Sequence, residues 1–534
     1  MSQTKNRWVA LLFISMAISL VIIDGTIVNT IFPAVIEDLS LTSTEVQWVQ
    51  ESYVLVFASL LLVWGSLADR YGRKLLLLVG IVIFVLASIW AGNTDSAQAM
   101  ILARVVQGIG GAMVLPTTLS LVNANFEGKE RGIAFAVWGA TIGGMVAVGP
   151  VLGGWLATDF SWRWAFLINL PLGVIIIAGL MYFLGESKAE QRKGGIDWVG
   201  AIISVVMFST LVFGLIEGRV YGWWEQSNNQ FEMFGFVWPE GAISVIPVAL
   251  AISLIATVLF VLWERRREAE QKNVLLDLNL FRIASFRNGS IAAMIISMGE
   301  FGILFAIPLW LQNVLGLSPI SSGLVLLWLA GGAFVASGVG GALSGKLPPH
   351  RAVQLGVLLE LVGVAGIGFF ASPELGWTGV APFLFIYGIG IGLATAQLTG
   401  VIMVDVPMEK IGQGSGSQST VRQIGSALGI AVLGSVLFTG TQISFEDKLT
   451  GLNVETSQSV VLVDAVVESA GGAIPQLSEG LQAQQVPQAL ADEIQLAAGE
   501  SFTDGAKWAS FAAALFLLLG FASTFNLSSR VRKE

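Results

Sequence analysis

Asp24 lies within an apolar stretch close to the N-terminus, in the run IIDGTIVN of residues 22–29. A carboxylate at membrane depth is costly and rare, and it usually marks a pathway for protons or ions. Removal from water favours the protonated form of a carboxyl group. Asp24 is therefore a candidate proton carrier in a membrane protein.

Arg104 occupies another apolar stretch, and its side chain keeps its charge at any physiological pH. A cation in this position needs a partner, which could be Asp24 or a water network that leads to it. The alternative is a purely structural arginine that donates hydrogen bonds to backbone carbonyl groups. The sequence leaves both interpretations open.

Three further acids lie in apolar stretches or at their edges, namely Glu51, Glu300 and Glu360. Each could bind a proton or a cationic substrate, or could be a structural acid held by hydrogen bonds. Aromatic rings attract lipophilic cations through their π faces, although each ring alone could equally serve in packing or face lipid. We expect a substrate cavity that contains Glu300, Glu51, Trp48, Tyr53, Phe57 and Trp310.

The composition excludes several classes of function. Of the 534 residues, 54% are apolar and 12% are charged, and the mean hydropathy is +0.76, whereas a soluble protein carries about 25% charged residues. With no cysteine and a single histidine, His350, we expect no metal site. The sequence has no nucleotide-binding loop or nucleophile constellation, so we expect neither an enzyme nor a cofactor. The net charge of −9, with acids concentrated in residues 440–505, argues against nucleic-acid binding.

About twenty consecutive apolar residues suffice to span a bilayer. Alternating loops place 22 of the 28 Lys and Arg residues on one side, which is the positive-inside pattern with both termini in the cytoplasm. The first span follows basic residues as a signal peptide does, but it is too long and contains Asp24, so we expect it to be retained. Fourteen spans are predicted: 8–30, 46–67, 75–92, 98–122, 132–157, 163–184, 197–217, 241–263, 288–312, 321–344, 351–371, 379–403, 414–438 and 506–528.

Two loops on the other side are long. Residues 218–240 are rich in aromatic side chains, as expected of a segment that lies at the membrane interface. Residues 440–505 show helical periodicity around 460–467 and again around 494–497. This pattern predicts short amphipathic helices that rest on the external face, and it leaves their part in transport open.

The turn after the second span reads GSLADRYGRK over residues 65–74. Glycines permit a tight turn, and an acid beside a helix N-terminus that faces arginines can form a charge latch. The turn resembles the signature loop of the major facilitator superfamily through Gly65, Asp69, Arg70, Gly72 and Arg73. The corresponding loop of the second half, residues 341–351, lacks the acid, so we expect the latch to work mainly through the first half.

The resemblance extends over almost the whole chain. Residues 104–111 resemble the membrane-arginine motif of the family, and residues 24–29 resemble the first-span motif of its fourteen-span drug:proton antiporter branch, the QacA-like exporters. A further stretch, with Gly149, Pro150, Gly153 and Gly154, resembles the antiporter motif of the family. In this motif the proline kinks the fifth span, and the glycines let it pack closely and limit leak while the two halves rock.

The resemblance implies an all-α polytopic membrane protein with the major facilitator fold. Two six-helix bundles, residues 1–187 and 273–534, would flank two extra helices within residues 188–272. Inverted symmetry between the halves would make Glu300 the counterpart of Asp24. The eleventh span would be peripheral, so Glu360 is expected to be structural.

The expected function is that of a proton-coupled antiporter that exports amphipathic, cationic drugs or toxic compounds by alternating access. Asp24 and Arg104 would couple protons to transport. The expected partners are a small-molecule substrate, protons and the lipid bilayer, with a monomer as the functional unit in a bacterial cytoplasmic membrane. Export of a lipid or an endogenous metabolite is the alternative, and a transport-dead membrane sensor is a further one.

Overall fold

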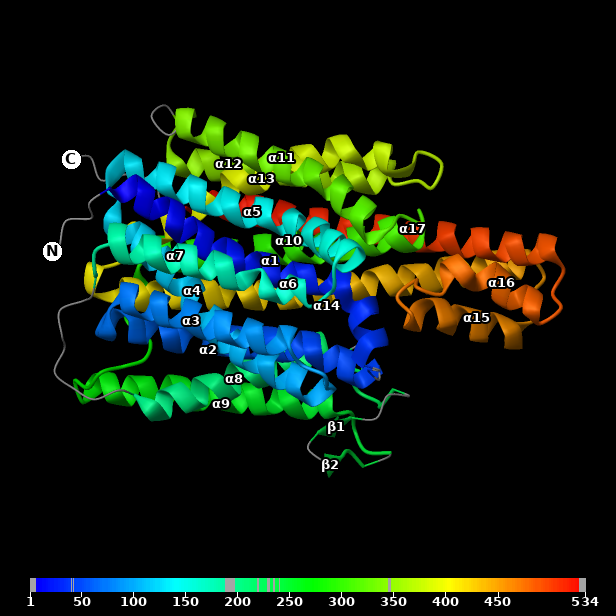
Figure 1. Ribbon diagram of the computed structural model, residues 1–534, viewed down its shortest axis with the longest axis horizontal. Coiled ribbons are helices and arrows are strands. Elements are labelled where there is room, and N and C mark those ends of the chain that lie inside the picture. Colours follow the sequence, from blue (N-terminus) through cyan, green and yellow to red (C-terminus); the bar gives the residue numbers. More distant parts are fainter. Residues whose placement is uncertain are drawn as a thin grey trace.

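The computed structural model describes residues 6–527, except for residues 40, 42, 188–196, 219, 228–230, 234–235, 240 and 344–346. The described chain is almost entirely helical, and most helices run along the long axis of the molecule (Figure 1). The long apolar segments form helices because a helix satisfies its backbone hydrogen bonds internally. Several of these helices contain a proline, among them those of Pro116, Pro150, Pro308 and Pro382. A proline removes one backbone donor, and inside a membrane the freed carbonyl group is satisfied by neighbouring helices, side chains or water.

The first half of the chain contains α1 (Arg7–Leu39), α2 (Ser43–Tyr71), α3 (Arg73–Gly92), α4 (Ala97–Asn125), α5 (Gly128–Asp159), α6 (Trp164–Leu167) and α7 (Asn169–Phe183). Next come α8 (Trp198–Ile216), β1 (Glu232–Met233), β2 (Phe236–Val237) and α9 (Val245–Ala269). The second half contains α10 (Ala284–Asn313), α11 (Pro319–Leu343), α12 (Pro349–Phe370), α13 (Gly376–Met403), α14 (Ile411–Gly451), α15 (Thr456–Glu468), α16 (Leu477–Ala483) and α17 (Gln488–Thr524). Three short 3-10 helices complete it: η1 (Leu278–Arg282), η2 (Met408–Lys410) and η3 (Ile474–Gln476).

The helices correspond to the predicted spans. Among the described residues, thirteen segments are long and apolar enough to cross a membrane. The remaining predicted span, 132–157, lies within α5. The chain is thus an all-α polytopic membrane protein, as its hydropathy predicts.

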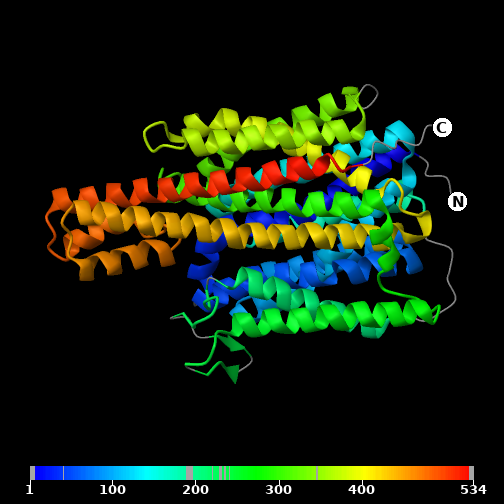
Figure 2. The same ribbon diagram turned by 180° about the vertical axis from the view of Figure 1, so that it is seen from behind.

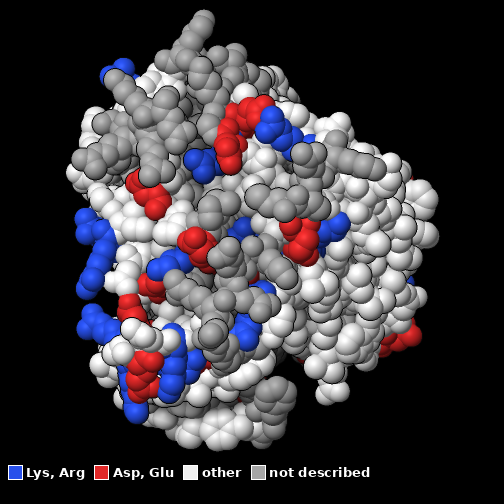
Figure 3. Space-filling view, turned by 90° about the vertical axis from the view of Figure 1, so that its left-hand side faces the viewer, with Lys and Arg blue, Asp and Glu red and all other residues white. Residues whose placement is uncertain are grey.

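Contacts within each half are extensive, and several helix pairs join the halves, among them α5 with α13 and α4 with α14. Helices α5 and α11 pack along each other, and so do α2 and α14. The extra pair, α8 and α9, packs on α2 at the side of the molecule away from α12 (Figure 1). Helices α1 and α17 respectively begin and end at the same end of the bundle, here called the terminal end. Its surface carries Lys and Arg side chains together with Asp and Glu (Figure 3).

At the opposite end, α14 and α17 continue beyond the other helices as one projection (Figure 2). Helices α15 and α16 pack against them around a buried apolar core that includes Phe445, Val466 and Phe502. The prediction of short helices is correct for residues 460–467, which lie in α15. It is wrong for residues 494–497, which belong to the long α17. The apolar core of the projection is continuous with that of the second half.

The aromatic-rich segment after α8 contains a feature that the sequence analysis did not anticipate. Strands β1 and β2 pair antiparallel, with Glu232 opposite Val237. The rings of Tyr221 and Phe231 contact each other edge to face, with centroids 5.3 Å apart. The segment therefore has a small aromatic core beside α8 and α9.

Candidate functional site

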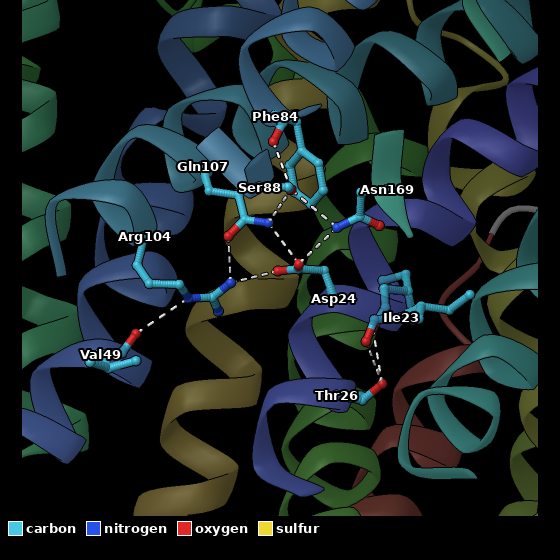
Figure 4. A network of polar contacts seen from close by, with 10 residues as sticks. Ile23, Asp24, Thr26, Val49, Phe84, Ser88, Arg104, Gln107 and Asn169 are labelled. Carbon is cyan, nitrogen blue, oxygen red and sulfur yellow. Dashed lines mark hydrogen bonds and ion pairs between the residues drawn. The ribbon is translucent and has the colours of Figure 1, made fainter. Parts of the chain in front are cut away.

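Asp24 lies at the centre of a buried polar network formed by α1, α3, α4 and α7 (Figure 4). Arg104 Nη1 lies 2.6 Å from Asp24 Oδ2, and both residues are 1% exposed. Asp24 Oδ1 accepts hydrogen bonds from Gln107 Nε2 at 2.6 Å and from Asn169 Nδ2 at 3.2 Å. The hydroxyl of Ser88 accepts a second bond from each of these amides, at 2.8 and 3.1 Å. The carboxylate is thus balanced by one charge and solvated by two neutral donors.

Arg104 has several partners besides the aspartate. Its Nη1 also donates to Gln107 Oε1 at 2.6 Å, and its Nε donates to the carbonyl oxygen of Val49 at 3.3 Å. The guanidinium carbon lies 4.3 Å from the ring centroid of Tyr53, within the range of a cation–π contact. Arg104 therefore keeps favourable contacts even when Asp24 is neutral.

The ion pair is not the only contact that holds Arg104. Removing one partner of a buried ion pair commonly costs about 3–5 kcal/mol, because the other charge is left unpaired. The acceptors around Arg104 reduce the cost of separating it from Asp24.

Glycines bring the backbones of this site close together. A Cβ atom at Gly108 of α4 would lie 2.8 Å from the carbonyl oxygen of Tyr53 in α2. One at Gly111 would lie 3.2 Å from both the ring of Phe57 and the hydroxyl of Tyr53. The glycine-rich stretch after Arg104 thus lets α2 approach α4 and places Tyr53 on the guanidinium.

The sequence analysis assigned no role to three members of the network, Gln107, Asn169 and Ser88. Gln107 belongs to residues 104–111, which resemble a family motif, and this is a signal that could have identified it. Ser88 stands in the apolar run VLASIW of residues 85–90. A single serine in a span most often bonds its own helix, as Ser88 does to the carbonyl of Phe84 at 2.8 Å, so nothing in the sequence distinguishes it.

The antiporter motif lies directly against the helix that carries Asp24. A Cβ atom at Gly149 would collide with Thr26 Oγ1, and one at Gly153 would lie 2.8 Å from Ile27 Cγ1. On the other side of α5, Gly154 contacts Ile320 of α11, and the backbone after Pro150 lies 3.1 Å from a Cβ atom built at Gly323. Helix α5 therefore packs tightly on α1 in one half and on α11 in the other.

The signature loop forms a latch between the halves at the terminal end. Asp69 is paired with Arg73 at 2.7 Å and accepts hydrogen bonds from the backbone amides of Gly412 at 2.8 Å and Gln413 at 3.0 Å. These amides begin α14, where the helix dipole favours an anion. Gly65 allows this approach, because its Cβ atom would lie 2.6 Å from the carbonyl oxygen of Gly412.

The other residues of the loop shape the turn. Gly72 has a φ of 121°, a conformation that favours glycine. Beside it, the carboxylate of Glu186 accepts hydrogen bonds from the amides of Lys74 and Leu75. The guanidinium of Arg70 lies 6.0 Å from the ring centroid of Tyr71. Residues 344–346 of the corresponding loop in the second half lie outside the described residues.

The segment after α9 is also attached to the start of α14. Gln413 Nε2 donates to the carbonyl oxygen of Val274 at 3.1 Å, and Asp277 forms an ion pair with Lys410. Burial acts to raise the pKa of Asp277. Hydrogen bonds from Lys410 and from the amide of Asn279 outweigh it and hold the pKa below its usual value.

Glu300 lies in α10 and faces α13 and α14. Its Oε2 is 3.3 Å from Arg422 Nη2, and its Oε1 accepts a hydrogen bond of 3.3 Å from Thr395. The residue is 3% exposed. Together with Ser297 it lines a small cavity of about 10 Å³, which is roughly the space of one water molecule and far below that of a drug-sized site.

The predicted aromatic residues lie in different surroundings and do not share the cavity of Glu300. The face of Tyr53 is covered by Arg104, and Phe57 stacks on Tyr53 with centroids 5.8 Å apart. Trp48 stacks on Phe213 of α8 at 6.5 Å. Tyr53 and Trp48 thus pack on residues of neighbouring helices and Phe57 on a ring of its own helix, which differs from the prediction of a single aromatic cavity.

Trp310 and Glu51 complete the predicted set. The indole Nε1 of Trp310 donates to Thr503 Oγ1 of α17 at 3.0 Å, and the ring lines a second small cavity, of about 10 Å³, between α10, α12 and α17. Glu51 belongs to α2, and its side chain lies outside the described residues.

The sequence matches a known family over most of its length. Residues 14–430 match the description of the Major Facilitator Superfamily. The chain belongs to this superfamily. It is therefore a multi-pass membrane transporter of a family that handles small molecules.

Curated relatives of this superfamily member include exporters of drugs and antibiotics. It is 30% identical to the tetracenomycin C resistance and export protein of Streptomyces glaucescens, over 84% of this chain and 79% of the relative. The multidrug efflux pump LfrA of Mycolicibacterium smegmatis is 29% identical over 97% of this chain and 95% of its own. The puromycin resistance protein pur8 of Streptomyces alboniger is 30% identical over 81% and 82% of the two chains.

Solved structures support the fold of this major facilitator protein. The human organic anion transporter MFSD10 superposes with a TM-score of 0.60, covering 97% of this chain and 99% of that one at 12% sequence identity. A bacterial homologue of the human lysosomal transporter Spinster superposes with a TM-score of 0.51. At these identities the likeness concerns the fold alone.

Proposed function

We propose that this transporter exports amphipathic, cationic drugs or toxic compounds in exchange for protons, by alternating access between its two halves. The observation that carries the proposal is the buried ion pair of Asp24 and Arg104. A carboxylate at this depth is expensive to maintain. The relatives named above, whose names describe drug efflux and antibiotic export or resistance, support the choice of substrate class.

Protonation of Asp24 would break the charge balance with Arg104 and release α1 from α4. Because Gly149 and Gly153 pack α5 tightly on α1, a shift of α1 would be passed to α5 and from there to α11. Release of the proton on the other side would restore the pair. Cytoplasmic closure would depend on the latch of Asp69 with the start of α14.

Glu300 is our candidate for recognition of a cationic substrate in the second half. Its carboxylate is held by one arginine contact at 3.3 Å and one hydroxyl. This contact is longer than the 2.6 Å pair of Asp24, so a substrate cation could compete for Glu300 more easily. The cavity beside it must widen before a drug-sized molecule enters.

The excess of basic residues in loops at the terminal end supports a cytoplasmic location for both termini. A bacterial cytoplasmic membrane is the expected location, because the curated relatives named above are bacterial. We take one chain as the transport unit, because both halves and their shared interface lie within it.

The test is transport by the purified protein in liposomes with an imposed pH gradient. A fluorescent lipophilic cation should move against its gradient, and collapse of the pH gradient with an ionophore should stop it. Neutral, anionic and lipid-like amphiphiles form the comparison set. If the pH gradient drives transport of lipids but not of cations, the protein is a lipid exporter and not a drug exporter. If transport of cations is independent of the pH gradient, proton antiport is excluded.

A further inference from the structure

Glu360 of α12 is fully buried, although its span is expected to be peripheral. It lies where α12 crosses α13, and glycines on both helices bring the two backbones together. A Cβ atom at Gly390 of α13 would lie 2.6 Å from Glu360 Cγ, and one at Gly363 of α12 would lie 2.7 Å from the amide of Tyr387. Glu360 itself is 0% exposed. The crossing thus places an acid inside the second half and away from lipid.

Neither carboxyl oxygen of Glu360 has a hydrogen-bond partner among the residues that the structure describes. This differs from Asp24, which has three donors, and from Glu300, which has two. An ionised carboxylate without donors in an apolar interior is far more costly than a neutral acid. The surroundings of Glu360 therefore suit the protonated form.

The charged groups around Glu360 point to the same conclusion. Glu300 of α10 and Arg422 of α14 both act on it electrostatically. The hydroxyl of Tyr387 donates to the backbone oxygen of Glu300 at 3.0 Å. The one positive charge of Arg422 is already balanced by Glu300 at 3.3 Å. Two acids therefore share one base, and the cluster is neutral only when it holds one proton.

We propose that Glu360 and Glu300 share a single exchangeable proton, which makes the second half a proton-binding site in its own right. The cluster would be a second site, separate from that of Asp24. This inference rests on the proposed function, because it assumes that the proton is exchanged for the cationic substrate.

The exchange conserves charge and atoms. A monocation that binds at the cluster brings one positive charge. The O–H bond of the protonated acid then breaks, its electron pair stays on the carboxylate, and the proton leaves to water. The cation and the proton thus compete for one negative charge. The hydroxyls of Ser297 and Thr395 beside Glu300 offer a polar route for the proton.

The first test needs no substrate. The infrared spectrum of the purified wild-type protein at neutral pH should contain the C=O stretch of a protonated carboxyl group. This band should be absent from the spectrum of Glu360→Gln, and subtraction of the two spectra should isolate it. The same band should be lost in Glu300→Gln, because the remaining Glu360 would then ionise to balance Arg422. Glu360→Asp should keep the band, and Glu374→Gln, which changes an exposed acid after α12, should leave it unchanged.

The second test counts protons. In the Asp24→Asn background, binding of tetraphenylphosphonium in weakly buffered solution should release about one proton per bound cation. Addition of Glu360→Gln should abolish that release. Two of these measurements do not require that Glu360→Gln folds. They are the infrared spectrum of Glu300→Gln and the proton release from the Asp24→Asn protein.

Two outcomes would overturn the inference. A band that survives in Glu360→Gln would mean that Glu360 is not the protonated acid. A band that is lost in Glu360→Gln but persists in Glu300→Gln would mean that the proton is fixed on Glu360 and not shared. If the predicted infrared losses occur but the wild type transports no cation in liposomes, the shared proton stands and the proposed function fails.

Discussion

Asp69 of α2 accepts a hydrogen bond of 2.8 Å from the backbone amide of Gly412, a residue 343 positions later in the chain. Gly412 is the second residue of α14, so the carboxylate faces the positive end of a long helix. Such a contact typically contributes about 0.3–1 kcal/mol, and up to about 2 kcal/mol when partly buried. The two halves are therefore joined at the terminal end by a charge that one substitution removes.

Asp69→Asn should open the terminal end more often. The amide keeps the shape of the carboxyl group but loses its charge towards Arg73 and α14. A loss of about 1–2 kcal/mol corresponds to a change of about 5–30-fold in the open population. The measurement is the thiol-labelling rate of Ser415→Cys, a fully buried position in this cysteine-free chain. Glu374→Gln is the control, and an unchanged rate in Asp69→Asn would show that the latch does not hold the end closed.

Asp24→Asn should abolish transport driven by a pH gradient while the protein still folds and binds substrate. The amide can accept a hydrogen bond from Arg104 but cannot take up and release a proton. Transport in liposomes should fall at least about a hundredfold, the order of effect expected when a proton-transfer group is removed. Asp38→Asn changes an exposed acid of the same helix that pairs with Arg163, and it should transport normally. Near-normal transport by Asp24→Asn would assign the carrier elsewhere.

Gly149→Ala should block transport through a steric conflict with Thr26. The added Cβ atom would collide with the hydroxyl of Thr26, and overpacking of this kind costs about 1–3 kcal/mol. Thr26→Ala should restore part of the activity in the double variant, which a double-mutant cycle would quantify. Gly25→Ala is the matched control, because a Cβ atom there meets nothing within 4 Å. Equal loss in the single and double variants would exclude the contact as the cause.

The ion pair of Asp277 and Lys410 should make stability depend on pH. The pKa of Asp277 is lower in the folded protein than the usual value, so its contribution is present above about pH 4 and is lost as the pH falls through the lowered pKa. Asp277→Asn should therefore lower the unfolding temperature at pH 6, and the difference from the wild type should shrink steadily as the pH is lowered below about 4. The asparagine can still accept the bond from the amide of Asn279, so the comparison isolates the charge. A difference that persists unchanged to pH 3 would point to packing instead of charge.

Topology can be tested with two single cysteines. Arg266→Cys at the end of α9 should react only with reagents on the cytoplasmic side. Gly480→Cys in the projection, where a Cβ atom meets nothing within 4 Å, should react only from outside. Reaction of both positions from one side would contradict the predicted orientation.

Hydropathy was sufficient to predict the membrane helices. A segment that crosses lipid must be apolar and must form its backbone hydrogen bonds internally as a helix, so each span is visible as one apolar run. It could not predict where the helices end outside the membrane. Residues 440–450 and 488–505 continue α14 and α17, because α15 and α16 cover their apolar side chains. That packing is a tertiary effect with no counterpart in local hydropathy.

The sequence predicts the charged residues of the site, because a charge within an apolar run is easily recognised. It does not predict the neutral polar residues that bind to them. Asp24 and Arg104 are conspicuous in the sequence, and the structure pairs them. Ser88 is not conspicuous, since a serine costs little in a helix. Glu360 was undervalued because its burial depends on the crossing of α12 and α13, which Gly363 and Gly390 create. The aromatic cavity was misjudged because the orientation of a ring such as Trp48 is decided by its neighbours.

The projection makes α14 a lever. The helix has 41 residues, so it is about 60 Å long, and its last turns, from residue 440 to Gly451, extend about 18 Å past the predicted span. Each degree by which the second half tilts would move the tip by about 0.3 Å relative to the end of that span. Small tilts of the helices would therefore produce a larger displacement at the tip of the projection than at Asp24. A fluorophore on α15 would therefore report the transport cycle from outside the membrane without touching the residues that bind protons.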